Sequence, residues 1–261
     1  MPLSEAPRAS VCALAIMAKA PRNGEVKTRL VPPLTAEEAT ILSACFLKDI
    51  TANFIVASTT VPVAGYVAYS PAGSAALFRD LVAAQILLLP PRRIGLGASL
   101  LDAAEDLLAA GYGAVCLVNA DSPTLPTSIL LQAVEALRAP GDRVVLGPAC
   151  DGGYYLIGLK QAHQHLFEDI AWSTERVFRQ TIERATAIGL DVVTLPLWYD
   201  VDDATSLGWL CGEVLSGCRP PRCVLDGYAA PQTGEYLSRL VASGAGERLG
   251  VHPMAIGHRE R

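Results

Sequence analysis

Runs of apolar residues alternate with amphipathic stretches along most of the chain. Val11–Ala18 is continuously apolar without helical spacing, and a charged segment with Pro and Gly, 19–33, follows it. This pattern predicts a buried strand that ends in a long loop. Thr35-Ala-Glu-Glu38 then predicts a capping box that opens a helix to about Ile50. Further strands are expected at 61–69, 85–89, 114–119, 143–146, 154–159 and 191–197, and helices near 74–84, 99–110, 127–138, 174–188 and 203–216.

This alternation predicts a three-layer α/β domain with a mostly parallel central sheet covered by helices. Asp151-Gly-Gly-Tyr-Tyr155 interrupts it, because two strands meet there across a short glycine turn, and an antiparallel strand is expected. After Gly217 the pattern weakens. We therefore expect a domain at 1–217 and an appendage at 218–261, which docks on the domain or mediates contacts in a homodimer.

Composition narrows the class of protein. Of the 261 residues, 51% are hydrophobic, which is enough for one large domain, and the net charge of −5 argues against a nucleic-acid partner. Seven scattered cysteines lack the paired spacing of a zinc site and are expected to be reduced. No signal-like segment opens the chain, and no uninterrupted apolar run approaches about 20 residues. We expect a cytoplasmic protein with no membrane partner.

Polar residues that follow apolar strand runs are the first candidates for chemistry, because parallel α/β sheets bind ligands beyond the carboxyl ends of their strands. After the first strand, one loop holds four basic residues, Lys19, Arg22, Lys27 and Arg29. Ammonium and guanidinium groups suit a di- or triphosphate, although a solvated surface loop has the same composition. The loop is neither a Walker A loop nor a G-x-G-x-x-G fingerprint.

Acidic residues follow two other strands. Asp121 comes directly after the strand at 114–119 and could hold Mg²⁺, or it could cap a turn before Ser-Pro. In Trp198-Tyr-Asp-Val-Asp-Asp203, the side chains of Asp200 and Asp202 share a face if the segment is extended, and Asp203 is expected to cap the next helix. Together with the basic loop, these acids form the set that a metal-bound nucleotide requires.

Two further segments contain candidate residues. Asp151 lies among the glycines of 147–154, where it could orient an acceptor or act as a base, or belong to a tight hairpin turn. In Trp172-Ser-Thr-Glu175, Ser173 is expected to cap a helix, although the tryptophan could also line a sugar or base pocket. No histidine forms a nucleophile–histidine–acid set, and no serine lies in a G-x-S-x-G elbow, which weakens hydrolase interpretations.

The ordered motifs AKAPRNGEVKTRL, NADSPTLP, GPACDGGYYLIGL, WSTERV and DVDDATSL resemble the bacterial DUF2064 proteins, which are glycosyltransferase-like members of the nucleotide-diphospho-sugar transferase superfamily. The resemblance covers roughly Val11 to Gly217. It implies a Rossmann-like GT-A fold, a nucleotide-activated substrate, an acceptor of unknown identity and a divalent ion, Mg²⁺ or Mn²⁺. It also implies Lys27 and Arg29 near the phosphates, with Asp121 and Asp202 near the metal.

The reaction stays open at this level. Glycosyltransferases of this fold usually carry Asp-x-Asp at the metal strand, whereas this chain has Asn119 at the first position, a candidate nucleotide-binding residue. The Lys-x-Arg loop, the single Asp before Ser-Pro and the closing Asp-Val-Asp are also similar to small nucleotidyltransferases. We therefore weigh glycosyl transfer from an NDP-sugar and nucleotidyl transfer from an NTP equally. The alternative from another class is a nucleotide-binding module without catalysis.

Overall fold

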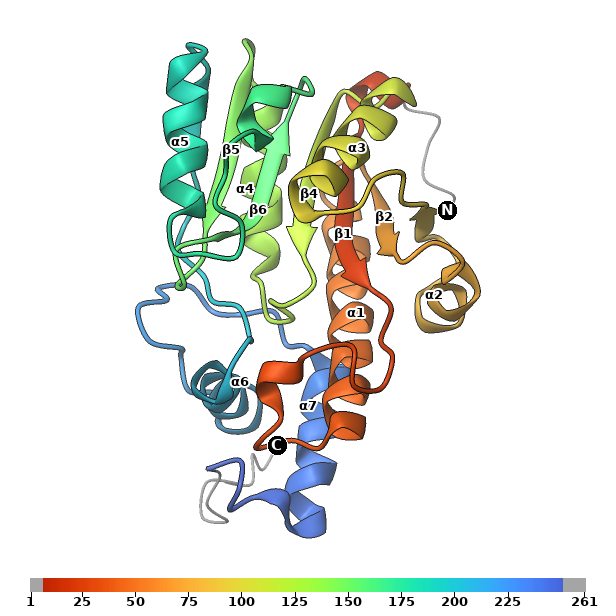
Figure 1. Ribbon diagram of the computed structural model, residues 1–261, viewed down its shortest axis with the longest axis vertical. Helices are drawn as coiled ribbons and strands as arrows, with labels where there is room; N and C mark the ends of the chain where they lie inside the picture. The colour runs from red at the N-terminus through yellow and green to blue at the C-terminus, as the bar shows by residue number, and fades with distance from the viewer. Residues whose placement is uncertain (1–6, 251–261) are drawn as a thin grey trace.

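A computed structural model describes residues 7–250, which are built around one seven-stranded sheet (Figure 1). The strand order is β3-β2-β1-β4-β6-β5-β7. All neighbouring strands are parallel except the two pairs that β6 makes with β4 and β5, which confirms both the mostly parallel sheet and the antiparallel strand. The strands are β1 Cys12–Lys19, β2 Val63–Ser70, β3 Leu87–Leu89, β4 Ala114–Asn119, β5 Arg143–Pro148, β6 Tyr154–Leu159 and β7 Asp191–Thr194.

Helices cover both faces of this sheet. On one face α1 and α4 pack against the strands, with α6 and α7 beyond them, and on the other lie α3 and α5. The α-helices are α1 Ala36–Ser58, α2 Ala75–Leu81, α3 Leu96–Ala109, α4 Thr127–Arg138, α5 Val177–Ala187, α6 Ala204–Ser216 and α7 Pro231–Leu240. Short 3₁₀ turns span Arg8–Ser10, Thr28–Leu30 and Gln164–Phe167, and a π-helical turn spans Val241–Ala245.

The interior position of β1 in the sheet explains why its sequence is apolar from Cys12 to Ala18. Leu14 and Ile16 point to the face covered by α1, and Ala13 and Ala15 point to the face covered by α3. All four are fully buried. A parallel strand in the middle of a covered sheet has no solvent side, so its residues need not alternate with polar ones.

The capping box at the start of α1 is confirmed. The Thr35 hydroxyl accepts the Glu38 N–H at 3.2 Å, and the Glu38 carboxylate accepts the Thr35 N–H at 2.8 Å. The helix continues to Ser58 rather than to about Ile50, because Phe54 and Ala57 extend its buried stripe. Asp203 likewise caps α6 by accepting the Ser206 N–H at 2.8 Å, as predicted.

By length and composition alone, α1 could cross a membrane. Lys48 and Asp49 lie within the helix, so its sequence contains no uninterrupted apolar run of about 20 residues. In the structure α1 packs along the sheet, and 56% of its most apolar window is buried. Core helices pass the same test, so the observed packing accounts for the composition.

The start of α5 differs from the sequence prediction. Ser173 was expected to be the N-cap, but the helix begins at Val177 and Ser173 has a left-handed backbone with φ of 63°. The Thr174 hydroxyl instead donates to the carbonyl oxygen of Ala171 at 2.7 Å and accepts the Arg176 N–H at 3.3 Å. These bonds form a separate turn ahead of the helix, so the Ser173 prediction was wrong.

The described part of the C-terminal segment packs against α1. Figure 1 shows α7 alongside the N-terminal half of α1. The buried Asp49 carboxylate accepts the N–H groups of Gln232 and Thr233 at 3.0 and 2.8 Å, at the start of α7. Arg248 donates to the Glu38 carboxylate at 2.8 Å. These contacts show docking within one chain, and the division at 217/218 stays a prediction.

Candidate active site

The strand ends place three loops at one edge of the sheet. β1 and β4 are parallel neighbours, so Lys19 and Asn119 lie at the same edge, and the loops that follow carry Lys27 and Asp121. The turn between β5 and β6 reaches this edge as well and carries Asp151. Residues distant in sequence therefore meet where a parallel sheet binds ligands.

The turn before β6 is tight around Asp151. The Asp151 carboxylate accepts the N–H of Gly153 at 2.8 Å, and Gly152 adopts a φ of 91°. A Cβ at Gly152 would lie 2.3 Å from the carbonyl oxygen of Glu175, so a side chain there would collide with the backbone. The glycines thus hold Asp151 at the edge of the sheet while the turn packs against the segment before α5.

The segment after β7 crosses from β5 toward β4. The carbonyl oxygen of Trp198 accepts the N–H of Cys150 at 3.0 Å, and the N–H of Val201 donates to the carbonyl oxygen of Asp121 at 2.9 Å. The Ser122 hydroxyl donates to the carbonyl oxygen of Tyr199 at 2.9 Å. These bonds join the segment after β7 to the β5–β6 turn and to the loop after β4, so the acidic residues 200–203 lie beside both.

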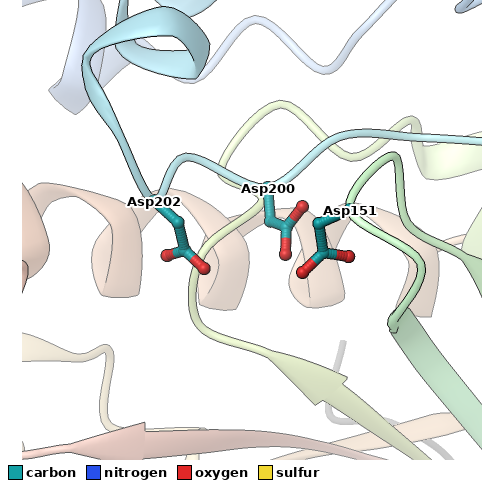
Figure 2. A group of neighbouring side chains, drawn as sticks. All are labelled: Asp151, Asp200 and Asp202. Carbon is teal, nitrogen blue, oxygen red and sulfur yellow. The ribbon is translucent and has the colours of Figure 1, made fainter. Parts of the chain in front are cut away.

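Three carboxyl groups gather along this crossing. Asp151, Asp200 and Asp202 each offer an oxygen, and these oxygens lie within 4.8 Å of one another. Figure 2 shows Asp200 between the other two, with its carboxyl group close to that of Asp151. Burial, together with the charges of Asp151, Asp202 and Asp121, raises the pKa of Asp200 to about 7. Such crowding of like charges is relieved by a bound cation.

Lys27 lies beside this group and is almost enclosed, with a side chain only 6% exposed. Its ammonium contacts the Asp121 carboxylate, donates to the carbonyl oxygen of Val201 at 2.6 Å, and donates to Oδ1 of Asp202 at 3.1 Å. Burial alone would lower the pKa of Lys27, but the charges of Asp121 and Asp202 outweigh burial and raise it. Lys27 is therefore a fixed positive charge inside the site.

The other basic residues of the loop take different positions. Arg29 is exposed and lines the same cavity as the acids, and Lys19 donates to the carbonyl oxygen of Glu25 at 2.9 Å at the margin of that cavity. Arg22 points elsewhere and donates to the Ser74 hydroxyl at 3.2 Å. Two of the four predicted phosphate-binding residues thus remain free to meet a phosphate beside the acids.

A cavity of about 470 Å³ contains this arrangement. Of the site residues predicted from sequence, Arg22 alone does not line it, and those that do are Lys19, Lys27, Arg29, Asn119, Asp121, Asp151 and Asp202. A second cavity of about 810 Å³ lies beyond β1, β2 and β3 and shares Lys19 and Leu96 with the first. The two form a continuous surface along the carboxyl edge of the sheet.

Sequence reasoning left several lining residues out of the predicted site. The sequence prediction places Asp121 and Asp202 near the metal and gives Asp200 no role there, although three acids within four residues indicate more than helix capping. Trp172 also lines the cavity, with its ring packed at the start of α3, where a Cβ on Gly97 would lie 2.7 Å from it. Tyr154 lies edge-on to Trp172, with ring centroids 6.5 Å apart. No pattern in the sequence brings these two rings together.

Part of the chain matches a known protein family. The family model DUF2064, described as an uncharacterized protein conserved in bacteria, matches residues 54–174. This match confirms the family resemblance over the part of the chain that contains NADSPTLP and GPACDGGYYLIGL. No curated protein matches the chain.

One solved structure shares the fold, and two others are less similar to the chain. A Desulfovibrio desulfuricans G20 protein, provisionally named a nucleotide-diphospho-sugar transferase, is 25% identical, with a TM-score of 0.73, and the match covers 88% of this chain and 95% of that one. CMP:2-keto-3-deoxy-manno-octonic acid synthetase in complex with CTP is 10% identical, covering 76% and 95%, with a TM-score of 0.48. The 4-diphosphocytidyl-2C-methyl-D-erythritol synthase of Anaerococcus prevotii DSM 20548 is 10% identical, covering 76% and 95%, with a TM-score of 0.47. The first match confirms the predicted fold class, that of nucleotide-diphospho-sugar transferases.

Proposed function

We propose that this chain is a metal-dependent transferase that acts on a nucleotide-activated substrate. One observation carries the proposal: three carboxyl groups from two separate loops converge in a cavity that also contains free basic groups. The carboxylates suit a divalent ion, and the basic groups suit the phosphates that such an ion accompanies. The likeness to a nucleotide-diphospho-sugar transferase supports the same class.

The side chains fit a hard divalent cation. Asp151, Asp200 and Asp202 offer oxygen ligands only, which favours Mg²⁺ or Mn²⁺ over softer ions. Burial, and after it the charges of the neighbouring aspartates, raise the pKa of Asp200, so a cation beside it would favour its ionised form. An ion held there would neutralise charge that develops on transferred or departing phosphate oxygens. Asp202 keeps the metal role that the sequence predicts, and Asp200 and Asp151 join it.

The nucleotide would follow the edge of the sheet. Arg29 can grip two phosphate oxygens at once and Lys19 can place a point charge beside them, while Asn119 offers an amide at the end of β4. The larger cavity beyond β2 and β3 has room for the nucleoside, between Tyr69 and the segment that begins at Arg92. Phosphates would then lie between the two cavities, next to the carboxylates.

The acceptor side has a different lining. Asp151 is exposed at the rim, where it can orient a hydroxyl group as well as contribute to the metal site. The rings of Trp172 and Tyr154 form an apolar part of the same wall. A ring-shaped acceptor, or the sugar of an NDP-sugar, would pack against this wall.

A thermal-shift screen of NTPs and NDP-sugars, with and without Mg²⁺ or Mn²⁺, tests the proposal. A ligand present at about 100 times its Kd stabilises the native state by about 2.7 kcal/mol, which raises Tm measurably. Preference for NTPs selects nucleotidyl transfer, and preference for NDP-sugars selects glycosyl transfer. Metal-dependent binding with no turnover of any bound compound would select the non-catalytic module. Absence of any metal-dependent shift would contradict the proposal.

A further inference from the structure

We infer that the Lys27 ammonium takes the place of a second divalent cation in this site, so that it holds Asp121 and Asp202 in position and leaves room for one bound metal ion. This inference rests on the proposed function in one respect: the single remaining ion is the one assigned to Asp151, Asp200 and Asp202. Lys27 is thereby a positioning residue, which acts through the carboxylates.

The surroundings of the ammonium resemble those of a metal ion. Three oxygens contact it, from the Asp121 carboxylate, the Asp202 carboxylate at 3.1 Å and the Val201 carbonyl at 2.6 Å. Two carboxylates and a backbone carbonyl are the ligands that Mg²⁺, Mn²⁺ and Ca²⁺ take in proteins. The Phe46 ring covers the ammonium, with its centroid 5.4 Å away.

The same contacts leave the ammonium no donor for a phosphate. A lysine ammonium has three N–H groups, and here each has an oxygen acceptor within the protein. The side chain is 6% exposed, so an incoming phosphate would have to displace a carboxylate to reach it. Arg29 lies open to the cavity, and Lys19, which donates to the carbonyl oxygen of Glu25, is exposed there and keeps further N–H groups.

The loop backbone directs Lys27 inward. Its φ of 51° is left-handed, a conformation that a lysine adopts at some cost, and the buried side chains of Val26 and Leu30 anchor the loop on either side. The lysine links positions 174 and 175 residues apart in the chain. The loop after β1 is thereby tied to the segment after β7 and to the start of the loop after β4.

The charge of Lys27 decides how many cations the four neighbouring aspartates can bind. Four aspartates lie together, Asp121, Asp151, Asp200 and Asp202, and Lys27 provides the positive charge among them. A carboxylate has two oxygens, so Asp202 can accept from Lys27 with one and still offer the other to a metal ion. Removal of the ammonium would expose a second set of oxygen ligands around Asp121.

Mn²⁺ titration of the full chain, with free Mn²⁺ counted by electron paramagnetic resonance, tests the inference. The parent is expected to bind one ion. Lys27→Met keeps an unbranched side chain as long as the aliphatic part of lysine but lacks the ammonium group, and it is expected to bind one ion more than the parent. Lys27→Met combined with Asp121→Asn should return to the parent count, because the exposed ligand set is then incomplete. Asp121→Asn alone should bind one ion with Kd changed less than about threefold, since Asp121 is not a ligand of that ion.

The titration distinguishes failure of the proposed metal site from failure of the inference about Lys27. A parent that binds no Mn²⁺ would contradict the proposed metal site, whereas the gain of one ion in Lys27→Met would still support the Lys27 assignment. No gain in a folded Lys27→Met protein, checked by circular dichroism, would overturn the inference. If Lys27→Met does not fold, Asp121→Asn decides: loss of Mn²⁺ affinity by more than about tenfold would make Asp121 a metal ligand and overturn the inference.

Discussion

Asp49, which is buried between α1 and α7, and the half-buried or exposed acids at the carboxyl edge of the sheet have opposite kinds of surroundings. Asp49 is fully buried between α1 and α7 and accepts two backbone N–H groups at the start of α7. Asp200 lies among three other aspartates, and in the described residues no N–H group from another residue donates to it. The Asp49 carboxylate therefore has hydrogen-bond donors from the protein itself, whereas the Asp200 carboxyl group lies among other negative charges.

This difference in surroundings indicates that Asp49 stabilises the fold and that Asp200 serves function. Burial raises the pKa of Asp49, and the N–H groups of Gln232 and Thr233 at the start of α7 favour its ionised form and offset part of that cost. Carboxylates that crowd together destabilise the protein until a cation arrives, and proteins tolerate this where a ligand provides compensation. Neutralising Asp49 should therefore cost stability, whereas neutralising Asp200 should increase it.

The largest effect is expected at Asp202. Asp202→Asn removes a charge that faces both Lys27 and the proposed ion, so Mn²⁺ affinity should fall by at least about 100-fold. The measurement is isothermal titration with MnCl₂. Asp203→Asn is the matched control, because Asn caps a helix as well as Asp does and Asp203 serves as the N-cap of α6. Equal Mn²⁺ affinity in both variants would remove Asp202 from the metal site.

Asp49→Ala should be the most destabilising change. Two N–H groups at the start of α7 would lose a charged acceptor, and we expect the free energy of unfolding to fall by about 2 kcal/mol. Urea denaturation at 25 °C gives this value. The exposed Asp80, on α2, is the control, and Asp80→Ala should change stability by less than about 0.5 kcal/mol. A smaller loss at position 49 than at position 80 would show that α7 docks without this cap.

These two regions also show how far the sequence predicts the molecule. Apolar runs and caps predict nearly every strand and helix, because the apolar run of β1 and the capping box at Thr35 can be recognised from neighbouring residues alone. The strand-end rule correctly brings Asp121 and Asp202 together. The rule cannot predict which side chains contact each other, since Lys27 contacts Val201, which lies 174 residues further along the chain. The contact between Asp49 and α7 is equally distant, so helix 36–58 shows no sign of it in its own pattern.

Asp200→Asn should stabilise the metal-free protein, with the sign opposite to Asp49→Ala. The folded pKa of Asp200 is about 7, above the unfolded value of about 3.9, so the native state binds more protons between these pH values. The cost of ionising Asp200 therefore appears as pH rises above about 4 and is complete above about 7. In EDTA, the stability gain of the variant over the parent should be about 2 to 3 kcal/mol larger at pH 8 than at pH 5.

Thermal and urea unfolding at the two pH values measure this difference. The control is Asp80→Asn, which should show no pH-dependent gain because Asp80 is exposed on α2. If Asp200→Asn is less stable than the parent at pH 8, Asp200 is a matched carboxylate like Asp49. The comparison between the two regions would then fail.

The smallest effect distinguishes the two arginines of the loop after β1. Arg29 lines the cavity beside the acids, whereas Arg22 donates to the Ser74 hydroxyl and lines neither of the two cavities. Exposed cations contribute modestly because solvent screens them, so Arg29→Ala should weaken binding of a nucleoside triphosphate or NDP-sugar by about threefold. Arg22→Ala should leave the Kd unchanged within error, although the sequence alone counts both among the phosphate-binding residues. Titrations at low and high salt sharpen the test, because an effect through phosphate charge must shrink as salt rises. Equal weakening by both substitutions would mean that the nucleotide extends past β1 toward α2, beyond the cavity that holds the carboxylates.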